Sequence, residues 1–491
     1  MSSSQEPYSK SEAFDIETFD VVIIGAGISG INCAYRLQTE HPRVSFVILD
    51  SRDGLGGTWA QFTYPGVRSD SDMNGLGFAW HPWTSPRPFA DGAQILEYLK
   101  DAARKYNITE RIRIRHRVSS ADWSSKSQQW ALTIDHEGEQ KHLRASWMIL
   151  GTGYFDHQTP LQTKIPGLEN FQGKVIHPQF WPNDYDYENK KIAVIGSGAT
   201  SVTLVPRLAT KAAQVTMIQR SPTYIRAMDN TSWVHKHLPG PLASACRRLT
   251  YTIRMHLAVI FCHYFPDAAR EFLRKATIER LPKWVDQDPH FKPRYNPWDQ
   301  RMCLDSDGRF YESLHRPNVK IITGNIENIT DSEVQMRDGE TVDADVIVPA
   351  TGFIMKLGGD IDINVDGERV SWSKRLIWNG AMLEEVPNMI FMIGYTNNSW
   401  TLRVDNVAMI LVRLLQYMAG HALKSAVPEA PKEAAAETEH LWQLNSTYAM
   451  LAEDRLPVYG KTGPWKPMTS PFLDYFRARW GDYTSGLHFS L

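Results

Sequence analysis

The sequence predicts an α/β fold with two parallel sheets, the second formed by a segment inserted in the first. Residues 19–30 and residues 191–201 each read as a short apolar strand, a glycine-rich turn and the start of a helix. Two further apolar runs, 148–153 and 346–353, also end in turns of small residues and bracket the second unit. Short apolar runs of this kind are typical of buried parallel strands. The repetition predicts two dinucleotide-binding domains of Rossmann type.

The first unit has the complete spacing of a dinucleotide-binding turn. Gly25, Gly27 and Gly30 follow a strand and open a helix, and Asp50 ends the next strand. In such a turn the first glycine permits the bend, the second admits a pyrophosphate and the third lets helix and strand pack closely. The helix N-terminus then favours the anion, and Asp50 is expected to accept hydrogen bonds from ribose hydroxyls. A plain strand-turn-helix is the alternative.

The second unit has the same turn with a different charge at its end. Gly196 and Gly198 occupy the first two glycine positions, and Ser201 replaces the third glycine. Arg220, followed by Ser221, stands where the first unit has an acid. A guanidinium can bind a 2′-phosphate through several donors, whereas a carboxylate would repel it. We therefore expect FAD in the first unit and NADPH in the second, with a solvated surface arginine as the alternative.

The strand pattern also predicts a domain organisation. We assign residues 18–155 and 335–491 to the FAD domain and residues 156–334 to the NADPH domain. A mostly helical, basic insert is expected over about 225–290, and residues 1–17 are expected to form a flexible N-terminal segment.

Composition excludes several classes of protein. The 491 residues carry 53 Lys and Arg against 55 Asp and Glu, so the chain lacks the basic character of a dedicated nucleic-acid binder. The cysteines form no CxxC pair, which argues against structural zinc, and no metal site is predicted. No signal peptide or transmembrane run is evident, which predicts a cytoplasmic protein; peripheral attachment to a membrane stays open. Nothing in the sequence indicates an oligomeric state.

Two longer patterns resemble those of one flavoenzyme family. Residues 56–70 match the pattern [A/G]GxWxxxx[F/Y]P[G/M]xxxD, and residues 171–182 match FxGxxxHxxxW followed by Pro or Asp. These patterns are similar to those of type I Baeyer–Villiger monooxygenases, the class B flavoprotein monooxygenases, and the subgroup of the ethionamide-activating monooxygenase is the most similar. The residues that carry the resemblance are Gly56, Gly57, Thr58, Trp59, Tyr64, Pro65, Gly66, Asp70, Phe171, Gly173, His177, Trp181 and Pro182.

The resemblance implies roles for particular residues. Gly57, Thr58 and Trp59 would contact the flavin nucleotide. Asp70 would be the active-site acid near the flavin, and Arg301 the arginine over the isoalloxazine, with Asp70 orienting it through a charge-assisted ion pair. Phe171, Gly173, His177 and Trp181 would couple domain motion to catalysis rather than perform chemistry. Gln300 departs from relatives that have a lysine there, which leaves Arg220 as the main determinant of NADPH selectivity.

The resemblance also implies a reaction. An FAD-dependent enzyme would consume NADPH and O₂ and insert one oxygen atom into a ketone through a C4a-peroxyflavin, giving an ester or lactone. Oxidation of sulfur or another heteroatom, with a thioether as substrate, is an alternative use of the same chemistry. A flavoprotein disulfide reductase is a distant alternative, because it requires a pair of redox-active cysteines. A non-catalytic flavin-binding protein is less consistent with the presence of Asp70, Arg301 and both glycine turns.

Overall fold

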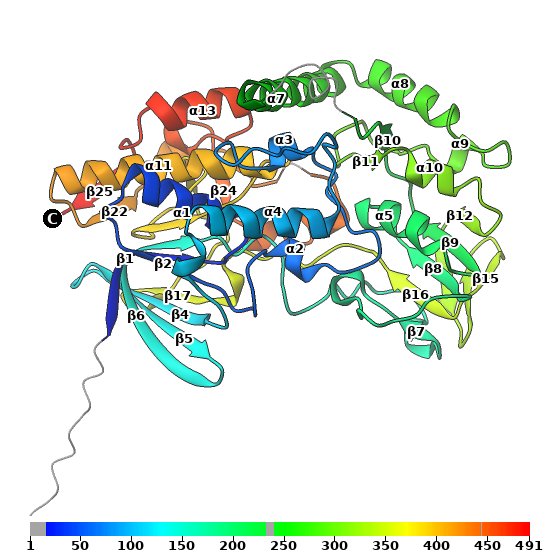
Figure 1. The fold of residues 1–491 in the computed structure, drawn as a ribbon, viewed down its shortest axis with the longest axis horizontal. Helices are drawn as coiled ribbons and strands as arrows, with labels where there is room; N and C mark the ends of the chain where they lie inside the picture. The colour runs from blue at the N-terminus through cyan, green and yellow to red at the C-terminus, as the bar shows by residue number, and fades with distance from the viewer. Residues whose placement is uncertain (1–15, 232–239, 443) are drawn as a thin grey trace, which may run out of the picture.

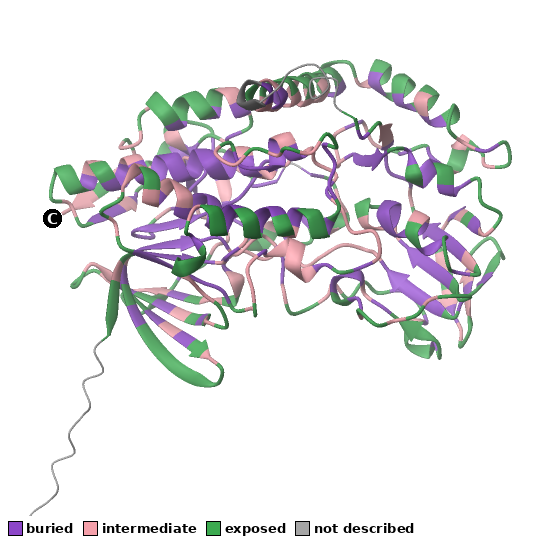
Figure 2. Ribbon diagram, viewed as in Figure 1, coloured by how far each residue is buried: buried purple, intermediate pink, exposed green. Residues whose placement is uncertain are grey.

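The computed structural model describes residues 16–231, 240–442 and 444–491. Almost all of the predicted N-terminal segment 1–17 lies outside these ranges. Figure 1 shows two lobes that each hold a sheet, with a group of helices along the upper edge of the view. The sheets form the interior of each lobe, as the buried positions in Figure 2 show. Within the described ranges, no helix combines the length and the apolar character needed to cross a membrane.

The first sheet contains the first predicted unit. Its parallel part has the order β21-β6-β1-β2-β3, and a mixed extension runs from β6 through β5 and β4 to β17 and β18, in which only β4 and β17 pair in parallel. Its strands are β1 (Glu17–Ile24), β2 (Phe46–Leu49), β3 (Ile112–Arg113), β4 (Arg117–Ser124), β5 (Gln129–His136), β6 (Glu139–Leu150), β17 (Asp362–Val365), β18 (Glu368–Arg369) and β21 (Met389–Phe391). The last four residues of β1 are all buried, as the continuous apolar run predicts.

The second sheet contains the second predicted unit and is entirely parallel. Its order is β12-β9-β8-β16-β7, and a small antiparallel sheet, β13-β14-β15, lies between β12 and β16 in the chain. The strands are β7 (Lys174–Val175), β8 (Lys191–Ile195), β9 (Gln214–Gln219), β12 (Val319–Thr323), β13 (Ile326–Ile329), β14 (Glu333–Met336), β15 (Thr341–Asp343) and β16 (Val346–Pro349).

Strand pairing corrects one predicted boundary. We placed residues 335–349 in the FAD domain, but β16 pairs along its length with β8 of the second sheet. Parallel pairing joins strands that are distant in the chain, so the order of apolar runs alone could not assign this strand. We propose that the NADPH domain extends to Pro349, and the division of the chain as a whole remains a proposal.

Helices cover both sheets. The predicted insert begins with a strand, β10 (Ile225–Met228), that pairs with β11 (Cys303–Ser306), and helices occupy much of the chain between them. The helices of the first lobe and of the C-terminal region are α1 (Ile28–Glu40), α2 (Thr58–Gln61), α3 (Met73–Leu76), α4 (Gly92–Lys105), α11 (Trp400–Gly420), α12 (Thr447–Met450) and α13 (Pro471–Trp480). Those of the second lobe and its insert are α5 (Ala199–Leu208), α7 (Gly240–Tyr264), α8 (Pro266–Ile278), α9 (Gln287–His290) and α10 (Arg309–Ser313).

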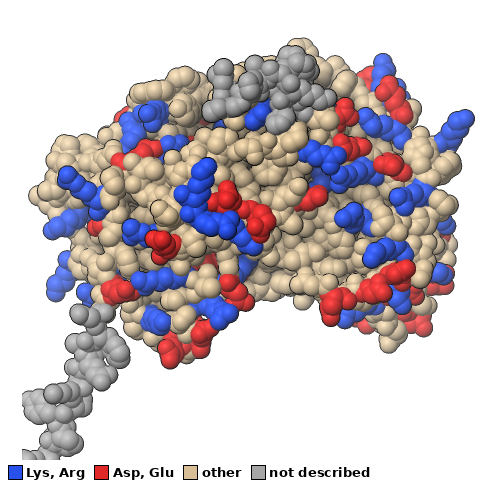
Figure 3. Space-filling model, viewed as in Figure 1, with Lys and Arg blue, Asp and Glu red and all other residues tan. Residues whose placement is uncertain are grey.

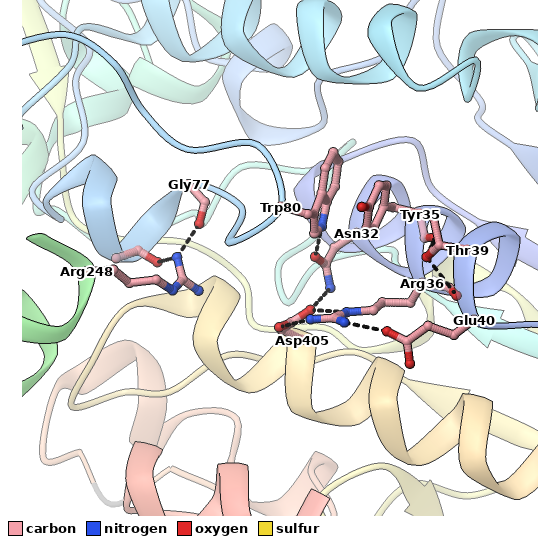
Figure 4. A network of polar contacts seen from close by, with 10 residues as sticks. Asn32, Tyr35, Arg36, Thr39, Glu40, Gly77, Trp80, Arg248 and Asp405 are labelled. Atoms are coloured by element: carbon pink, nitrogen blue, oxygen red, sulfur yellow. Dashed lines mark hydrogen bonds and ion pairs between the residues drawn. The ribbon is translucent and has the colours of Figure 1, made fainter. Parts of the chain in front are cut away.

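The C-terminal region returns to the first lobe. Its short strands form three pairs: β19 (Ile377–Trp378) with β20 (Met382–Leu383), β22 (Ser425–Pro428) with β25 (Leu487–Ser490), and β23 (Thr438–His440) with β24 (Val458–Gly460). Helix α11 packs against α1 through a polar network that Figure 4 shows. The Asp405 carboxylate accepts hydrogen bonds from Arg36 Nε at 2.8 Å and Asn32 Nδ2 at 3.1 Å. Residues 369 positions apart in the chain therefore stabilise the first lobe together.

Candidate active site

A cavity of about 940 Å³ lies where the two lobes meet. Residues of both glycine turns, of the helix that follows Gly57, and of the segments that connect the lobes line it. The predicted site residues among them are Gly25, Gly27, Asp50, Gly57, Thr58, Trp59, Asp70, Gly196, Gly198, Arg220, Ser221 and Arg301. The fold therefore places residues of both predicted nucleotide sites and the predicted catalytic pair around one space.

The first glycine turn leaves no room for side chains. Gly25 has a φ of +107°, and a Cβ on it would lie 2.6 Å from the carbonyl oxygen of Gly151. A Cβ on Gly30 would lie 2.0 Å from the carbonyl oxygen of Gly25, so this glycine serves helix–strand packing and does not line the cavity. Asp50 accepts hydrogen bonds from the backbone N–H groups of Ala26 at 2.7 Å and Arg52 at 3.0 Å. Asp50 thus fixes the turn and keeps acceptor capacity on the cavity side.

The motif that contains Gly57 meets the first turn directly. Gly57 has a φ of +56°, and a Cβ on it would lie 3.0 Å from Cα of Gly27. Gly27 and Gly57 are the N-caps of α1 and α2, and neither helix start has a side-chain cap. Free N–H groups at adjacent helix starts attract an anion. The close glycine backbones and the adjacent Asp50 fit the pyrophosphate and ribose of FAD.

The second glycine turn repeats this geometry. Gly196 has a φ of +137°, and a Cβ on it would lie 2.2 Å from the carbonyl oxygen of Ala350. Gly198 is the N-cap of α5, again without a side-chain cap. Ser201 is buried, and its hydroxyl lies 3.4 Å from the position of a Cβ on Gly196, so a small side chain fits here. These residues fit a second dinucleotide.

Arg220 follows β9 as predicted and is exposed at the cavity. Its Nη2 donates a hydrogen bond to Thr447 Oγ1 at 3.2 Å. Nearby, Gln300 Nε2 donates to the carbonyl oxygen of Asn445 at 3.2 Å. The C-terminal segment around α12 therefore closes this side of the cavity, a contact that no local sequence pattern indicated.

Arg301 and Asp70 both line the cavity but do not form the predicted ion pair. Among the described residues, no hydrogen bond or ion pair joins them. Burial opposes the charge on Arg301, but Asp70 and the nearby tyrosines Tyr154, Tyr448 and Tyr251 together outweigh it, so the pKa of Arg301 lies above its ordinary value. The sequence patterns locate Asp70 and Arg301 along the chain, but the distance between the two side chains depends on how the two lobes pack together. Asp70 acts on Arg301 through its electric field rather than through a direct contact.

Aromatic and amide groups outside the predicted site residues complete the cavity wall. Trp400 and Tyr154 pack together with ring centroids 5.1 Å apart, and Trp400 Nε1 donates to Ser29 Oγ at 3.0 Å. Asn398 Oδ1 accepts from the N–H of Ser399 at 2.8 Å, which leaves its buried Nδ2 without a partner in the described part of the chain. Asn398 could not be predicted as a site residue, because an asparagine in a loop usually indicates only a turn.

The cysteines do not form a redox pair. All four are described and free. Cys303 lies in the cavity wall beside Arg301, and burial raises the pKa of its thiol to about 12. The cavity therefore lacks the dithiol that a disulfide reductase needs.

The predicted linker residues lie outside the cavity wall, beside the connections between the lobes. Phe171 and Trp181 are buried, and Gly173 approaches the carbonyl oxygen of Asp345 so closely that a Cβ would lie 2.5 Å from it. His177 Nδ1 accepts from the N–H of Gln179 at 3.2 Å, and burial lowers the pKa of His177 to about 4.

This segment is hydrogen-bonded to both lobes. Gln179 Nε2 donates to the carbonyl oxygen of Asp156 at 2.6 Å, and Thr63 Oγ1 donates to the carbonyl oxygen of Trp181 at 3.2 Å. Asp156 belongs to the first crossing segment, which runs beside the second through an antiparallel bridge between Phe155 and Met355. Lys356 also donates to Asp156 at 3.1 Å.

Sequence comparison identifies the family. The pattern described as pyridine nucleotide-disulphide oxidoreductase matches residues 22–260. The FAD-containing monooxygenase EthA of Mycolicibacterium smegmatis is 40% identical over 480 residues, which cover 96% of this chain and 97% of that protein. This chain belongs to the FAD-containing monooxygenases. The probable FAD-binding monooxygenase AlmA of Acinetobacter baylyi is 37% identical over 96% of each chain.

Solved structures share the fold of this monooxygenase. An open crystal structure of cyclohexanone monooxygenase has a TM-score of 0.73 at 21% identity and covers 97% of this chain and 100% of its own. An oxidised steroid monooxygenase bound to NADP has a TM-score of 0.74 at 20% identity, with 96% and 99% covered. The predicted fold with two dinucleotide domains is thereby confirmed, as is the predicted class of flavin monooxygenase, and the distant alternative of a disulfide reductase is set aside.

Proposed function

We propose that this monooxygenase uses NADPH and O₂ to insert one oxygen atom into a ketone, giving an ester or lactone. The observation that carries the proposal is the single cavity that both glycine turns share, with the buried cation of Arg301 in its wall. The resemblance of residues 56–70 and 171–182 to Baeyer–Villiger monooxygenases supports the same reaction.

The chain offers a separate place for each cofactor. Gly25, Gly27 and Gly57 would hold the pyrophosphate of FAD, and Asp50 its ribose. Gly196 and Gly198 would hold the pyrophosphate of NADPH, and Arg220 would bind the 2′-phosphate. When bound, FAD accepts hydride from NADPH and activates O₂ for transfer.

Arg301 supplies a positive charge that does not depend on pH. Guanidinium is not deprotonated in proteins, and Asp70 further favours its charged form. Such a cation would stabilise the oxyanion that forms when a ketone carbonyl is attacked. Loss of one preorganised donor of this kind costs about 3–4 kcal/mol in the transition state.

The remaining wall has the properties that oxygen transfer requires. Tyr154, Phe62 and Trp400 line the cavity with aromatic surface, which limits access of water and of stray protons. The free Nδ2 of Asn398 offers a neutral donor on the same wall, suited to a carbonyl oxygen.

The Arg301→Ala variant tests this proposal. It should still oxidise NADPH, because the two dinucleotide turns are untouched, and release peroxide in place of product. Ester formation from a panel of ketones, measured by mass spectrometry, should fall by about 100-fold or more. Arg301→Lys is the matched control and should retain more product than the alanine variant.

Thioethers in the same assay separate the two reactions. Attack by a thioether forms no oxyanion on the substrate, so sulfoxide formation should depend less on Arg301 than ester formation does. Near-normal ester formation by Arg301→Ala would contradict the role of this residue. Wild-type enzyme that yields only sulfoxides from the whole panel would overturn the ketone proposal in favour of heteroatom oxidation.

A further inference from the structure

Helix α7 has an apolar stripe on its outer face that stays exposed among the described residues. Leu249, Ile253, Leu257, Phe261 and Tyr264 recur every three or four residues, so they lie on one side of the helix. Leu257 is 57% exposed and Tyr264 71% exposed. Isolated exposed apolar residues are ordinary, but a continuous row of large ones marks a surface that contacts another apolar phase.

The opposite face of α7 is fixed to the first lobe. Arg248 Nη1 donates hydrogen bonds to the carbonyl oxygens of Gly77 at 2.7 Å and Asn74 at 3.1 Å, at the end of α3. Figure 4 shows this contact. The helix is thereby held with its apolar stripe turned outward, and burying the stripe would require breaking these hydrogen bonds.

Helix α13 extends the apolar surface. Leu473, Phe476 and Trp480 lie on one face of α13 and are exposed, Trp480 by 64%. The two helices touch through His256 and Phe472, whose rings lie 5.7 Å apart. They follow one another along the upper edge of Figure 1, and in Figure 3 the surface over α13, to the left of the grey atoms, is mostly uncharged.

The charge beside the stripe is positive. The sequence of α7 contains no Asp or Glu, and the one acid of α13, Asp474, is buried against the Tyr395 hydroxyl at 2.8 Å. Arg254 on α7 and Arg479 on α13 are exposed and take part in no ion pair within the described ranges. Two helices with large apolar and aromatic residues and only cationic exposed charges have the character of segments that lie in an anionic lipid interface.

We propose that α7 and α13 dock this enzyme onto the surface of an anionic lipid bilayer, without crossing it. The apolar stripe would enter the boundary between headgroups and acyl chains, and Trp480 and Tyr264 would sit at headgroup level, where aromatic side chains are favoured. A second copy of the chain fits less well, because symmetric pairing of this face would bring cationic helices together. The lipid surface provides the opposite charge.

Flotation of the full-length, FAD-loaded enzyme with vesicles tests the proposal. Wild-type protein should float with phosphatidylcholine vesicles that contain phosphatidylglycerol, bind less to pure phosphatidylcholine, and bind less when sodium chloride is raised. Leu257→Glu/Phe261→Glu should lower the partition coefficient by about tenfold or more, because two large apolar contacts are replaced by charges of the wrong sign. Ile114→Glu, an exposed apolar position on the first lobe, is the matched control and should bind as wild type.

A second double variant and an activity measurement control for loss of folding. Arg254→Gln/Arg479→Gln keeps the apolar stripe and should reduce only the preference for phosphatidylglycerol. NADPH oxidation by both double variants should equal that of wild type, because none of these residues lines the cavity.

Three results would overturn the proposal. Wild-type enzyme that does not float with anionic vesicles would refute docking, and equal binding to neutral vesicles would refute the charge preference. Sedimentation velocity without lipid tests whether this face mediates self-association instead. If the wild-type protein does not bind vesicles but forms a dimer, and Leu257→Glu/Phe261→Glu is a monomer, this face is a contact between copies of the chain.

Discussion

A single arginine carries the expected preference for NADPH over NADH. Arg220 is exposed at the cavity, so its guanidinium is accessible to a 2′-phosphate. Its one hydrogen bond within the described part of the chain, to Thr447, leaves most of its five donors available.

The Arg220→Ala variant should lose discrimination between the cofactors. We expect KM for NADPH to rise roughly 10- to 100-fold, as loss of charge-assisted hydrogen bonds predicts, with KM for NADH little changed. Steady-state kinetics with both cofactors measures this. Thr447→Val removes the contact to Arg220 but keeps the guanidinium, so it should retain the preference. Equal efficiency of wild-type enzyme with NADPH and NADH would refute the assignment.

The contacts of Arg220 also show where prediction from sequence stops. The place of Arg220 after the second strand of a glycine-turn unit follows from local spacing, and the structure confirms that place. Thr447 and Asn398 join the cavity from segments more than 170 residues further along the chain, and no short pattern marks them. The Asp70–Arg301 pair failed as a direct contact for the same reason, since its two residues come from different lobes.

At the scale of elements, local patterns predicted both glycine turns and their helices, because each depends on residues adjacent in the chain. They did not place β16, which pairs with a strand some 150 residues earlier. The strand pairs of the C-terminal region were also unforeseen, because strands of three or four residues give too short an alternation to recognise.

The segment that contains His177 should make stability depend on pH. Burial lowers the pKa of His177 from 6.5 to about 4, so the unfolded chain binds a proton more readily than the folded one. The stabilising effect of a neutral His177 is therefore complete above pH 6.5 and is lost as pH falls toward 4. Thermal unfolding of the FAD-loaded enzyme at pH 8 and pH 5 should show a smaller loss of Tm for His177→Asn than for wild type.

The exposed His142 provides the control for this measurement. His142→Asn should lose as much Tm between pH 8 and pH 5 as wild type does. An equal loss for His177→Asn and wild type would show that the histidine titrates freely in the folded protein.

At the scale of the whole molecule, stability of the first lobe depends on contacts between distant parts of the chain. Asp405 of α11 is buried and accepts hydrogen bonds from Arg36 and Asn32 of α1. Asp405→Ala should lower the free energy of unfolding by about 3–5 kcal/mol, because it leaves the Arg36 guanidinium without its main partner.

Denaturant unfolding monitored by circular dichroism measures this loss. Glu40→Ala removes the more exposed partner of Arg36 and should cost less than about 1 kcal/mol. Similar losses for both variants would mean that the buried contact between α1 and α11 contributes no more than a surface ion pair.

The insertion of one lobe into the other has a consequence for biosynthesis. The strands of the second sheet are all translated once Pro349 has been added, whereas β21 and α11 of the first lobe are still missing. On the ribosome, the domain in the middle of the chain can therefore close before the domain that contains the N-terminus. Residues 18–150 must wait, with the apolar edge of β6 and one face of α1 unpaired, until the last quarter of the polypeptide emerges. This interval is when the nascent chain is most exposed to aggregation and most dependent on chaperones.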